Sequence, residues 1–309
     1  MEYIVGYTGF VGSNIVLAHE FEGKFNSKNI KEAYGGNPDL LVYAGVPAEM
    51  FLANTAPEKD REIIEQAISN IEKIKPKRIV LISTIAVYSD SRNATEETKI
   101  IEKDALPYGA NRRYLEHFVE EYTTEHLIVR LPAIYGKKLK KNFLYDYIHF
   151  IPSMLKMEKY LEFSEKEELI KTFYTKNENG FYYCKNVHGE DRKKLVECFE
   201  RLGFSALNFT DSRAEYQFYN LDNLWKDIQI AIKNNIKVLN IATEPVSVGK
   251  LYYFLEGKEF VNELSKPVPK YDFRTKYAEL YGGENGYILR KNEVLDDIKK
   301  YVNEEKALL

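Results

Sequence analysis

Near its start the chain reads Tyr3-Ile4-Val5-Gly6-Tyr7-Thr8-Gly9-Phe10-Val11-Gly12, a short apolar run followed at once by three evenly spaced glycines. The run predicts a strand at residues 3–6, and a helix-like stretch at residues 14–20 follows the glycines. Between a strand and a helix, glycines permit a tight turn and close approach of the backbone to a pyrophosphate, which the free N–H groups at the helix start can bind. Residues 6–12, the glycine loop, therefore predict a dinucleotide site; the alternative is a glycine-rich turn without a ligand.

Apolar runs and helical periodicity alternate through the first third of the chain, as expected for a parallel sheet covered by crossover helices. The pattern predicts strands at residues 39–44, 78–83 and 126–131, and helices at residues 58–75 and 109–124. The periodicity is lost after Gly136 and returns with a strand-like run at 216–221, a helix at 224–233 and a short strand at 237–241. The predicted fold class is α/β, a Rossmann-type doubly wound parallel sheet with a smaller C-terminal α/β region.

This pattern also predicts the division of the chain into domains. We expect an NAD(P)-binding Rossmann domain over residues 1–136 and a substrate-binding region over residues 137–309. A charged helical stretch at 154–174, a Tyr/Asn/Gly-rich segment at 174–189 and an amphipathic stretch at 191–202 indicate an inserted subdomain at about residues 152–211. The segments at 214–242 are expected to return to the Rossmann sheet, and residues 292–305 to form a closing helix.

The composition argues against nucleic acid, a membrane and a metal ion as partners of this chain. The chain has 44 Lys+Arg against 47 Asp+Glu, a formal net charge of −3, so bulk electrostatic binding of nucleic acid or of an anionic membrane is not expected. The sequence shows neither a secretion-signal pattern nor an apolar run long enough to span a membrane. Cys184 and Cys198 are too few for a disulfide framework, and the five histidines lack metal-ligand spacing. We expect a cytoplasmic globular protein without a metal site.

The end of the predicted second strand bears on the type of dinucleotide. An acid there usually binds the adenine-ribose 2′-hydroxyl of NAD, whereas the 2′-phosphate of NADP favours cations and hydroxyls. The stretch Phe25-Asn26-Ser27-Lys28 contains no acid, and Glu32 falls in the predicted following helix. The sequence therefore favours NADP slightly over NAD, with Ser27 and Lys28 as candidate contacts. The alternative for Lys28 is a solvated surface lysine.

A threonine, a tyrosine and an arginine follow the predicted strands at the same edge of the sheet. Thr84 ends the strand at residues 78–83, and Tyr108 and Arg112 open the next helix. Ligands of open α/β sheets bind at this edge, where the glycine loop also lies. Because residues i and i+4 share a helix face, Arg112 is expected near the Tyr108 hydroxyl, where its charge lowers the pKa of the phenol from about 10 towards neutrality. Thr84 is expected to hydrogen-bond a substrate oxygen and hold it against the phenol.

Four motifs together resemble the extended short-chain dehydrogenase/reductases, in particular the nucleoside-diphosphate-sugar epimerase/dehydratase family. They are the glycine loop, Ser83-Thr84-x-x-Val87-Tyr88, Tyr108-Gly-x-x-Arg112 and Arg130-Leu-Pro-Ala-Ile-Tyr-Gly136. Further matches are Ala44-Gly45, Asn54, residues 216–224, Asn240-Ile241, Glu244-Pro-Val-Ser247, Asp272 and Thr275-Lys276. The resemblance covers the chain except for about residues 152–211.

The resemblance implies a nicotinamide cofactor on the glycine loop and Thr84 and Tyr108 as the catalytic pair. The family usually carries lysine where Arg112 stands; arginine keeps the charge but differs in size and hydrogen-bond geometry. Family dehydratases carry an Asp-Glu pair after the threonine, whereas this chain has Ile85-Ala86. Dehydration is therefore not expected, because the acid and base that remove water are absent.

The remaining site candidates are also taken from this resemblance. Ala133 stands where an asparagine that contacts the sugar nucleotide is common, and Tyr216 where an arginine often meets the pyrophosphate; Asn142 and Arg213 lie near enough in sequence to replace them. With Thr84, these four are the candidate substrate-binding residues. The candidate cofactor-binding residues are Gly6, Thr8, Gly9, Phe10, Val11, Gly12, Asn26, Ser27, Lys28, Ala44, Gly45, Asn54, Ser83, Tyr108, Arg112 and Leu131. The resemblance also implies a homodimer formed through the helices at 58–75 and 109–124.

Two functions remain open from the sequence. The first is an NAD(P)-dependent reductase or epimerase acting on a nucleotide sugar, with hydride transfer at a sugar carbon and Tyr108 as acid/base. The second is a catalytically impaired NAD(P)-binding protein of the same fold, with a sensing or assembly role. The departures at Arg112, Ala133 and Tyr216 motivate the second.

Overall fold

The computed structural model describes residues 1–309, except for the side chain of Glu102. The chain divides into two compact units. The first unit comprises residues 1–138, 215–246 and 270–295, and the second comprises residues 139–214, 247–269 and 296–309.

The first unit is built on a six-stranded parallel sheet with strand order β12-β5-β4-β3-β1-β2. The strands are β1 (Glu2–Val5), β2 (Gly23–Phe25), β3 (Leu40–Tyr43), β4 (Arg78–Thr84), β5 (His126–Leu131) and β12 (Val238–Asn240). Because every pair is parallel, the C-terminal ends of β1, β3 and β4 lie side by side at one edge, where ligands of such sheets bind. The predicted α/β class with a Rossmann-type parallel sheet is confirmed.

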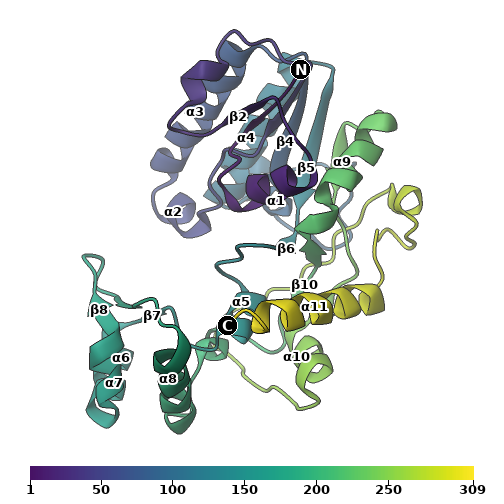
Figure 1. Cartoon of the computed structure of the whole chain (residues 1–309). Helices are drawn as coiled ribbons and strands as arrows, with labels where there is room; N and C mark the ends of the chain where they lie inside the picture. Colours follow the sequence, from purple (N-terminus) through teal and green to yellow (C-terminus); the bar gives the residue numbers. More distant parts are fainter. The chain divides into compact units, whose positions relative to one another are not determined.

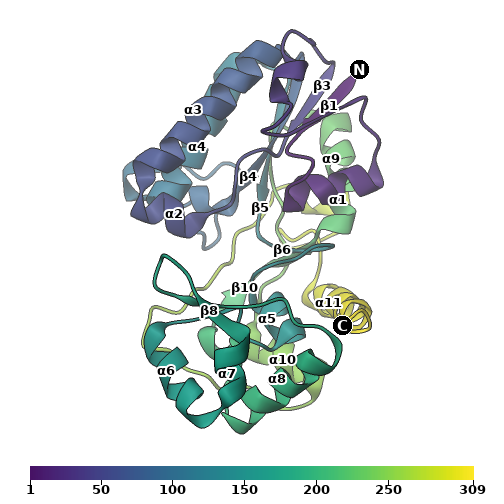
Figure 2. The ribbon, with the colours of Figure 1, turned by 60° about the vertical axis from the view of Figure 1, so that its left-hand side comes forward.

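Helices cover both faces of this sheet (Figures 1 and 2). On one face α3 (Pro57–Ile74) and α4 (Pro107–Tyr122) pack their apolar stripes against residues such as Leu41 and Ile79. On the other face α1 (Phe10–Ala18) and α9 (Leu224–Lys233) pack against residues such as Val42 and Val80. Successive strand residues therefore supply two separate cores, as expected for strands that are buried on both faces.

Shorter elements complete the first unit. They are η1 (Ile30–Ala33), α2 (Met50–Thr55), η2 (Ile85–Val87), η3 (Glu102–Asp104), β6 (Ala133–Tyr135), β10 (Glu215–Tyr216), β11 (Phe218–Asn220), η5 (Leu221–Asn223) and η6 (Ala278–Tyr281). Within the segment 214–242, β12 pairs with β5 at the edge of the large sheet, whereas β11 pairs with β6 in a separate two-stranded sheet. The strand-like run expected at 216–221 is thus two short strands outside the main sheet.

The second unit contains a small antiparallel sheet and several helices. Its elements are α5 (Phe143–His149), β7 (Met154–Leu155), α6 (Met157–Lys166), α7 (Glu168–Phe173), β8 (Tyr174–Lys176), β9 (Tyr182–Cys184), α8 (Gly189–Arg201), η4 (Ala206–Phe209) and α10 (Val248–Glu256). Two elements cross the boundary between the units: β13 (Val246–Ser247) and α11 (Lys291–Lys306). Three strands pair in the order β7-β9-β8. Aromatic residues of α6, β8 and α8, among them Phe163, Tyr174 and Phe199, form the core beside this sheet.

The helical stretch expected at residues 154–174 is wrong at both ends, since strands occupy Met154–Leu155 and Tyr174–Lys176. Pairing with β9 satisfies their backbone groups, and this partner is not visible in the local pattern. Among the helices that the structure describes, none is both long enough and apolar enough to cross a lipid bilayer.

Candidate functional site

The glycine loop connects β1 to α1 and leaves no room for side chains at two of its glycines. Gly6 has a positive φ of 90°, and a Cβ there would lie 2.4 Å from the carbonyl oxygen of Ala44. A Cβ on Gly12 would lie 2.2 Å from the carbonyl oxygen of Gly6. Gly9 donates its N–H to the Gly6 carbonyl at 2.9 Å and caps α1. The loop is thus a bare backbone turn at the N-terminus of a helix, the arrangement that accommodates a pyrophosphate.

The side chain of Asn14 fixes this loop. It is 2% exposed, and its Nδ2 donates to the carbonyl oxygens of Phe10 at 2.8 Å and of Lys137 at 3.0 Å. Its Oδ1 accepts the backbone N–H of Lys137 at 3.1 Å. Asn14 therefore ties α1 to the segment after β6. Of the other predicted loop contacts, Thr8 is exposed, and Phe10 and Val11 are half-buried.

The predicted contacts at the end of β2 form a turn on the surface. The Asn26 Oδ1 accepts the backbone N–H of Lys28 at 2.9 Å, and the backbone N–H of Asn26 donates to Asn29 at 2.8 Å. The side chains of Ser27 and Lys28 are exposed. Asn26 thus shapes the turn with its side chain, while the side chains of Ser27 and Lys28 face solvent.

The remaining predicted cofactor contacts lie at or beyond the ends of β3, β4 and β5. Ala44 and Gly45 follow β3 directly, and the Gly6 backbone packs against them. Leu131 is buried at the end of β5. Ser83 is also buried, and its hydroxyl donates to Glu116 at 2.6 Å, so this side chain is engaged inside the protein. Asn54 of α2 accepts the backbone N–H of Tyr108 at 3.1 Å, which fixes the start of α4.

Thr84, Tyr108 and Arg112 come together in the first unit. Thr84 ends β4, and its Oγ1 accepts the backbone N–H of Ala86 at 3.2 Å. The side chains of Thr84 and Arg112 both lie close enough to the Tyr108 hydroxyl to influence its pKa. The guanidinium carbon of Arg112 lies 4.1 Å from the centroid of the Tyr108 ring. The structure thus shows the juxtaposition that the i, i+4 spacing predicts.

The electrostatics of Tyr108 differ from the expectation. Burial raises the pKa of Tyr108 and outweighs the opposite effect of the Arg112 charge and of the hydrogen bonds with Thr84 and Arg112. The carboxylate of Asp60 raises the pKa of Tyr108 further. The expected fall of this pKa towards neutrality is therefore wrong, because burial and the Asp60 charge oppose the effect of Arg112.

Asp60 is a residue of the site that the sequence analysis did not identify. Its carboxylate accepts hydrogen bonds from the Arg112 guanidinium and from Asn111 Nδ2, the latter at 2.8 Å. Arg112 also donates to the carbonyl oxygen of Pro47 at 2.7 Å. A signal existed in the sequence, because Asp60 lies four residues before Ile64 on the buried stripe of α3. An acid in that position is expected to have a buried partner.

Gly109 sets the distance between α4 and η2. A Cβ at this position would lie 2.0 Å from the carbonyl oxygen of Ala86. We expect Gly109→Ala to push α4 away from η2 and to lower the free energy of unfolding by about 1–3 kcal/mol, the usual cost of overpacking. Chemical denaturation measures this change. Ala110→Ser, at the next residue of the same helix, is the control and should cost about 0.5 kcal/mol; equal costs would contradict the steric argument.

A buried polar network lies behind this site. Glu116 of α4 is fully buried and accepts hydrogen bonds from Arg130 at 2.6 and 3.0 Å, from Arg113 at 2.9 Å and from Ser83 at 2.6 Å. Arg130 also donates to the Tyr88 hydroxyl at 2.7 Å. The network joins β4, α4 and β5 and so supports the strand end that carries Thr84.

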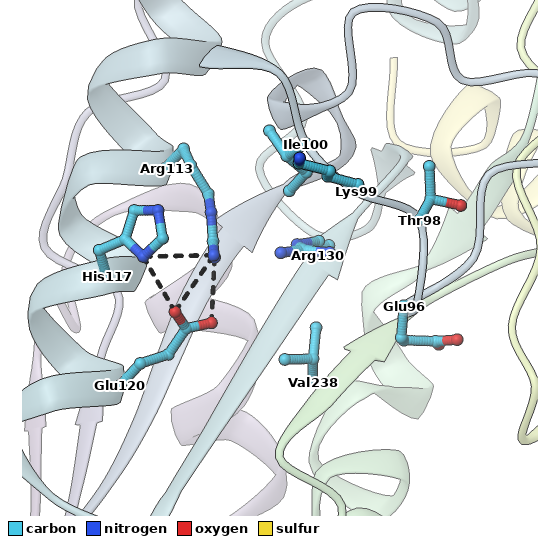
Figure 3. Close-up of a pocket in the computed structure, with 9 residues that line it drawn as sticks. All are labelled: Glu96, Thr98, Lys99, Ile100, Arg113, His117, Glu120, Arg130 and Val238. Atoms are coloured by element: carbon cyan, nitrogen blue, oxygen red, sulfur yellow. Dashed lines mark hydrogen bonds and ion pairs between the residues drawn. The ribbon is translucent and has the colours of Figure 1, made fainter.

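A cavity of about 300 Å³ lies in the first unit, on the side of α4 that bears Arg113 and His117. Figure 3 shows the residues that line it. Three of its polar residues pair with one another: Glu120 binds Arg113 at 3.0 Å and His117 at 3.2 Å. The described residues that line it do not include Thr84, Tyr108 or Arg112. They are Glu96, Thr98, Lys99, Ile100, Arg113, His117, Glu120, Arg130 and Val238. The cavity is therefore distinct from the Thr84–Tyr108–Arg112 cluster.

The four predicted substrate contacts besides Thr84 fall in both units. In the first unit, Ala133 begins β6, and the Tyr216 ring lies 5.8 Å from those of Phe218 and Tyr271, centroid to centroid. In the second unit, Asn142 caps α5 by accepting the backbone N–H groups of residues 144 and 145 at 2.9 and 3.1 Å. Arg213 binds Asp211 at 2.8 Å and Glu263 at 2.9 Å. The structure gives each of Asn142 and Arg213 a role within the second unit.

Comparisons with known proteins agree with the fold. Residues 26–170, just under half of the chain and beginning after the glycine loop, match the model of the NAD dependent epimerase/dehydratase family. None of the curated proteins matches the sequence.

Solved structures of low sequence identity share the fold over nearly the whole chain. UDP-glucose 4-epimerase from Thermotoga maritima, solved with UDP-glucose, is 14% identical with a TM-score of 0.60 and coverage of 98% of this chain and 99% of that chain. dTDP-4-dehydrorhamnose reductase from Bacillus anthracis, in complex with NADP, is 13% identical with a TM-score of 0.60 and coverage of 98% and 97%. UDP-glucuronic acid 4-epimerase from Bacillus cereus, in a complex that includes NAD, is 15% identical with a TM-score of 0.59 and full coverage of both chains, 100% and 100%.

The resemblance predicted from four short motifs is thus confirmed by a family match that spans three of them and by a fold shared over nearly the whole chain. Residues 26–170 thus match the NAD dependent epimerase/dehydratase family, and over nearly its whole length the chain shares the Rossmann-type fold of the epimerases and reductases named above.

Proposed function

We propose that the protein is an NAD(P)-dependent enzyme that acts on a nucleoside-diphosphate sugar, as a reductase or an epimerase, with hydride transfer at a sugar carbon. The observation that carries the proposal is the Thr84–Tyr108–Arg112 cluster beside β4, two strands from the glycine loop at the same edge of the sheet. The family match and the substrates and cofactors named for the similar structures support it.

The residues present fit a nicotinamide dinucleotide. The glycine loop has no room for a Cβ on Gly6 or Gly12, so its backbone is open to a ligand. The N-terminus of α1 offers amide donors to a pyrophosphate. The Ala44-Gly45 turn packs against the loop and borders the same edge. When bound, the nicotinamide supplies or accepts the hydride.

Side chains of this protein donate the proton and stabilise the group that loses it. Burial raises the pKa of the Tyr108 phenol, so the hydroxyl is protonated at neutral pH and acts as a donor to a sugar oxygen. Thr84, at the end of β4, hydrogen-bonds the same oxygen and orients it. Arg112 stabilises the phenolate that remains once the proton has left. A phenol that is protonated at neutral pH can donate its proton when a carbonyl is reduced. This favours the reductase over the epimerase.

Elimination of water does not fit this site. Ile85 and Ala86 follow Thr84, and Ile85 is buried in an apolar cluster with Val87 and Phe273. A dehydratase needs an acid and a base at the reacting carbons, and these two side chains supply neither. We therefore assign the reaction to hydride transfer without dehydration.

We also propose that NADP is preferred over NAD. Ser27 and Lys28 present a hydroxyl and a cation at the exposed turn after β2, and the first acid after this turn, Glu32, lies in η1. A 2′-phosphate binds a cation and hydroxyls, whereas a free ribose usually binds an acid. Titration of the protein with NADPH and with NADH, followed by cofactor fluorescence, should show tighter binding of NADPH; tighter binding of NADH would contradict the preference.

A panel assay tests the proposed function. The purified protein is mixed with NADPH and a series of 4-keto nucleoside-diphosphate sugars, and oxidation of NADPH is followed by absorbance; a parallel panel of nucleotide hexoses is analysed for epimers by chromatography. We expect oxidation or epimerisation with at least one substrate. Cofactor binding without any product across both panels would overturn the proposal and favour a binding protein without turnover. Absence of cofactor binding would contradict the proposed dinucleotide site itself.

A further inference from the structure

Arg112 is held on three sides by groups of the first unit. One guanidinium nitrogen donates to the Asp60 carboxylate, the other donates to the Pro47 carbonyl oxygen at 2.7 Å, and the guanidinium carbon lies 4.1 Å from the centroid of the Tyr108 ring. Arg112 is 5% exposed and Asp60 is 2% exposed. Because a charge so deeply buried requires a partner, the carboxylate determines where this guanidinium lies.

The carboxylate is itself fixed in place. Asp60 lies in the first turn of α3, where the helix dipole favours an anion. Asn111 donates its Nδ2 to the same carboxylate oxygen at 2.8 Å and to the Pro57 carbonyl at 3.2 Å. The amide of Asn111 therefore holds Asp60 against α4 independently of Arg112.

We propose that Asp60 is a positioning residue for Arg112 and Tyr108. Its carboxylate holds the Arg112 guanidinium over the Tyr108 ring and cancels much of the positive charge that Arg112 places beside the hydroxyl. The inference rests on the proposed function, in which Tyr108 donates the proton. An arginine and a buried aspartate then act together where the family usually carries a single lysine.

The groups around Tyr108 are consistent with this role. Arg112 on its own helix and Asp60 on α3 are the charged groups that act on the phenol, with opposite effects on its pKa. Two neutral groups also act on Tyr108: Thr84 of β4 influences the pKa of the hydroxyl, and Asn54 of α2 accepts the backbone N–H. Removal of the Asp60 charge alone should therefore leave Arg112 uncompensated and make the phenol more acidic.

The test is a direct titration of Tyr108. The protein is labelled with carbon-13 at the tyrosine Cζ, and the Tyr108 resonance is assigned by its loss in Tyr108→Phe. In Asp60→Asn we expect the titration midpoint of Tyr108 to move to lower pH, and the pH profile of turnover to move in the same direction. Glu58→Gln, an exposed position in the same helical turn with the same change in charge, is the control and should leave the midpoint where it is.

The outcomes separate this inference from the proposed function, since the titration requires no turnover. An unchanged midpoint in folded Asp60→Asn overturns the role of Asp60 even if the enzyme is active. Should Asp60→Asn fail to fold, the titration midpoint of Tyr108 is measured in the double variant Asp60→Asn/Arg112→Gln, in which both charges are removed. If the two charges compensate each other, its midpoint stays close to that of the wild type, whereas a large upward shift shows that Arg112 acts uncompensated and overturns the proposal.

Discussion

Replacement of Tyr108 with phenylalanine is expected to lower turnover by about 10²–10⁴-fold, the usual contribution of a positioned general acid. The substitution removes the hydroxyl whose pKa Thr84 and Arg112 influence, and it keeps the ring over which the guanidinium lies. Cofactor affinity should change little, because the glycine loop and the Ala44-Gly45 turn are untouched. Steady-state kinetics with the best substrate of the panel and fluorescence titration with NADPH measure the two quantities.

Tyr122→Phe is the matched control for this experiment. Tyr122 ends the same helix, fourteen residues after Tyr108, and its side chain is half-buried beside Phe118. Its loss of a hydroxyl should leave turnover within a factor of about two, since a change of about 0.4 kcal/mol or less is expected away from the site. If Tyr108→Phe lost cofactor affinity and turnover to the same degree, Tyr108 would have a structural role, and the proton donor would have to be sought elsewhere.

The pH dependence of the reaction follows from the same hydroxyl. The pKa of Tyr108 is raised by burial, so the protonated form that donates to a carbonyl persists at neutral pH and is lost only as the pH rises through that raised pKa. Reduction should accordingly slow on the alkaline side. Oxidation of an alcohol needs the phenolate and should accelerate over the same interval.

Much of the large sheet could be predicted because its signals are local. The strand expected at 126–131 is found at His126–Leu131, and the helix expected at 58–75 is found at Pro57–Ile74. Buried parallel strands give continuous apolar runs and crossover helices give a single stripe, so each element is visible in its own residues. The strands β7 and β8 were missed because their pairing with β9 comes from residues up to about thirty positions away.

The site was predictable in its residue types and less so in its electrostatics. The i, i+4 spacing placed Arg112 beside Tyr108 correctly, since both lie on one helix. Asp60 comes from a different helix, and its effect on Tyr108 depends on how α3 and α4 pack. An acid on an apolar stripe was the available signal, and it applies equally to Glu116, which lies one turn beyond Arg112 on the buried side of α4.

Glu116 carries the second large prediction. Glu116→Ala removes the acceptor of Arg130, which is 2% exposed, and leaves that guanidinium with the Tyr88 hydroxyl in place of a carboxylate. Breaking one side of a buried ion pair typically costs about 3–5 kcal/mol, because the remaining charge is desolvated without compensation. We expect a loss of that size in the free energy of unfolding of the first unit.

The chain provides both the probe and the control for this measurement. Its single tryptophan, Trp225, is buried in the core of the first unit, so its fluorescence during denaturation reports on that unit. Glu120 binds Arg113 from the same helix but is partly exposed, and Glu120→Ala should cost about 0–1 kcal/mol. Equal losses in the two variants would show that Arg130 finds another partner or water. A loss of unfolding free energy in Glu116→Ala alone would show that the first unit depends on the buried Glu116–Arg130 ion pair. Ser83, next to Thr84 at the end of β4, donates a hydrogen bond to the same carboxylate.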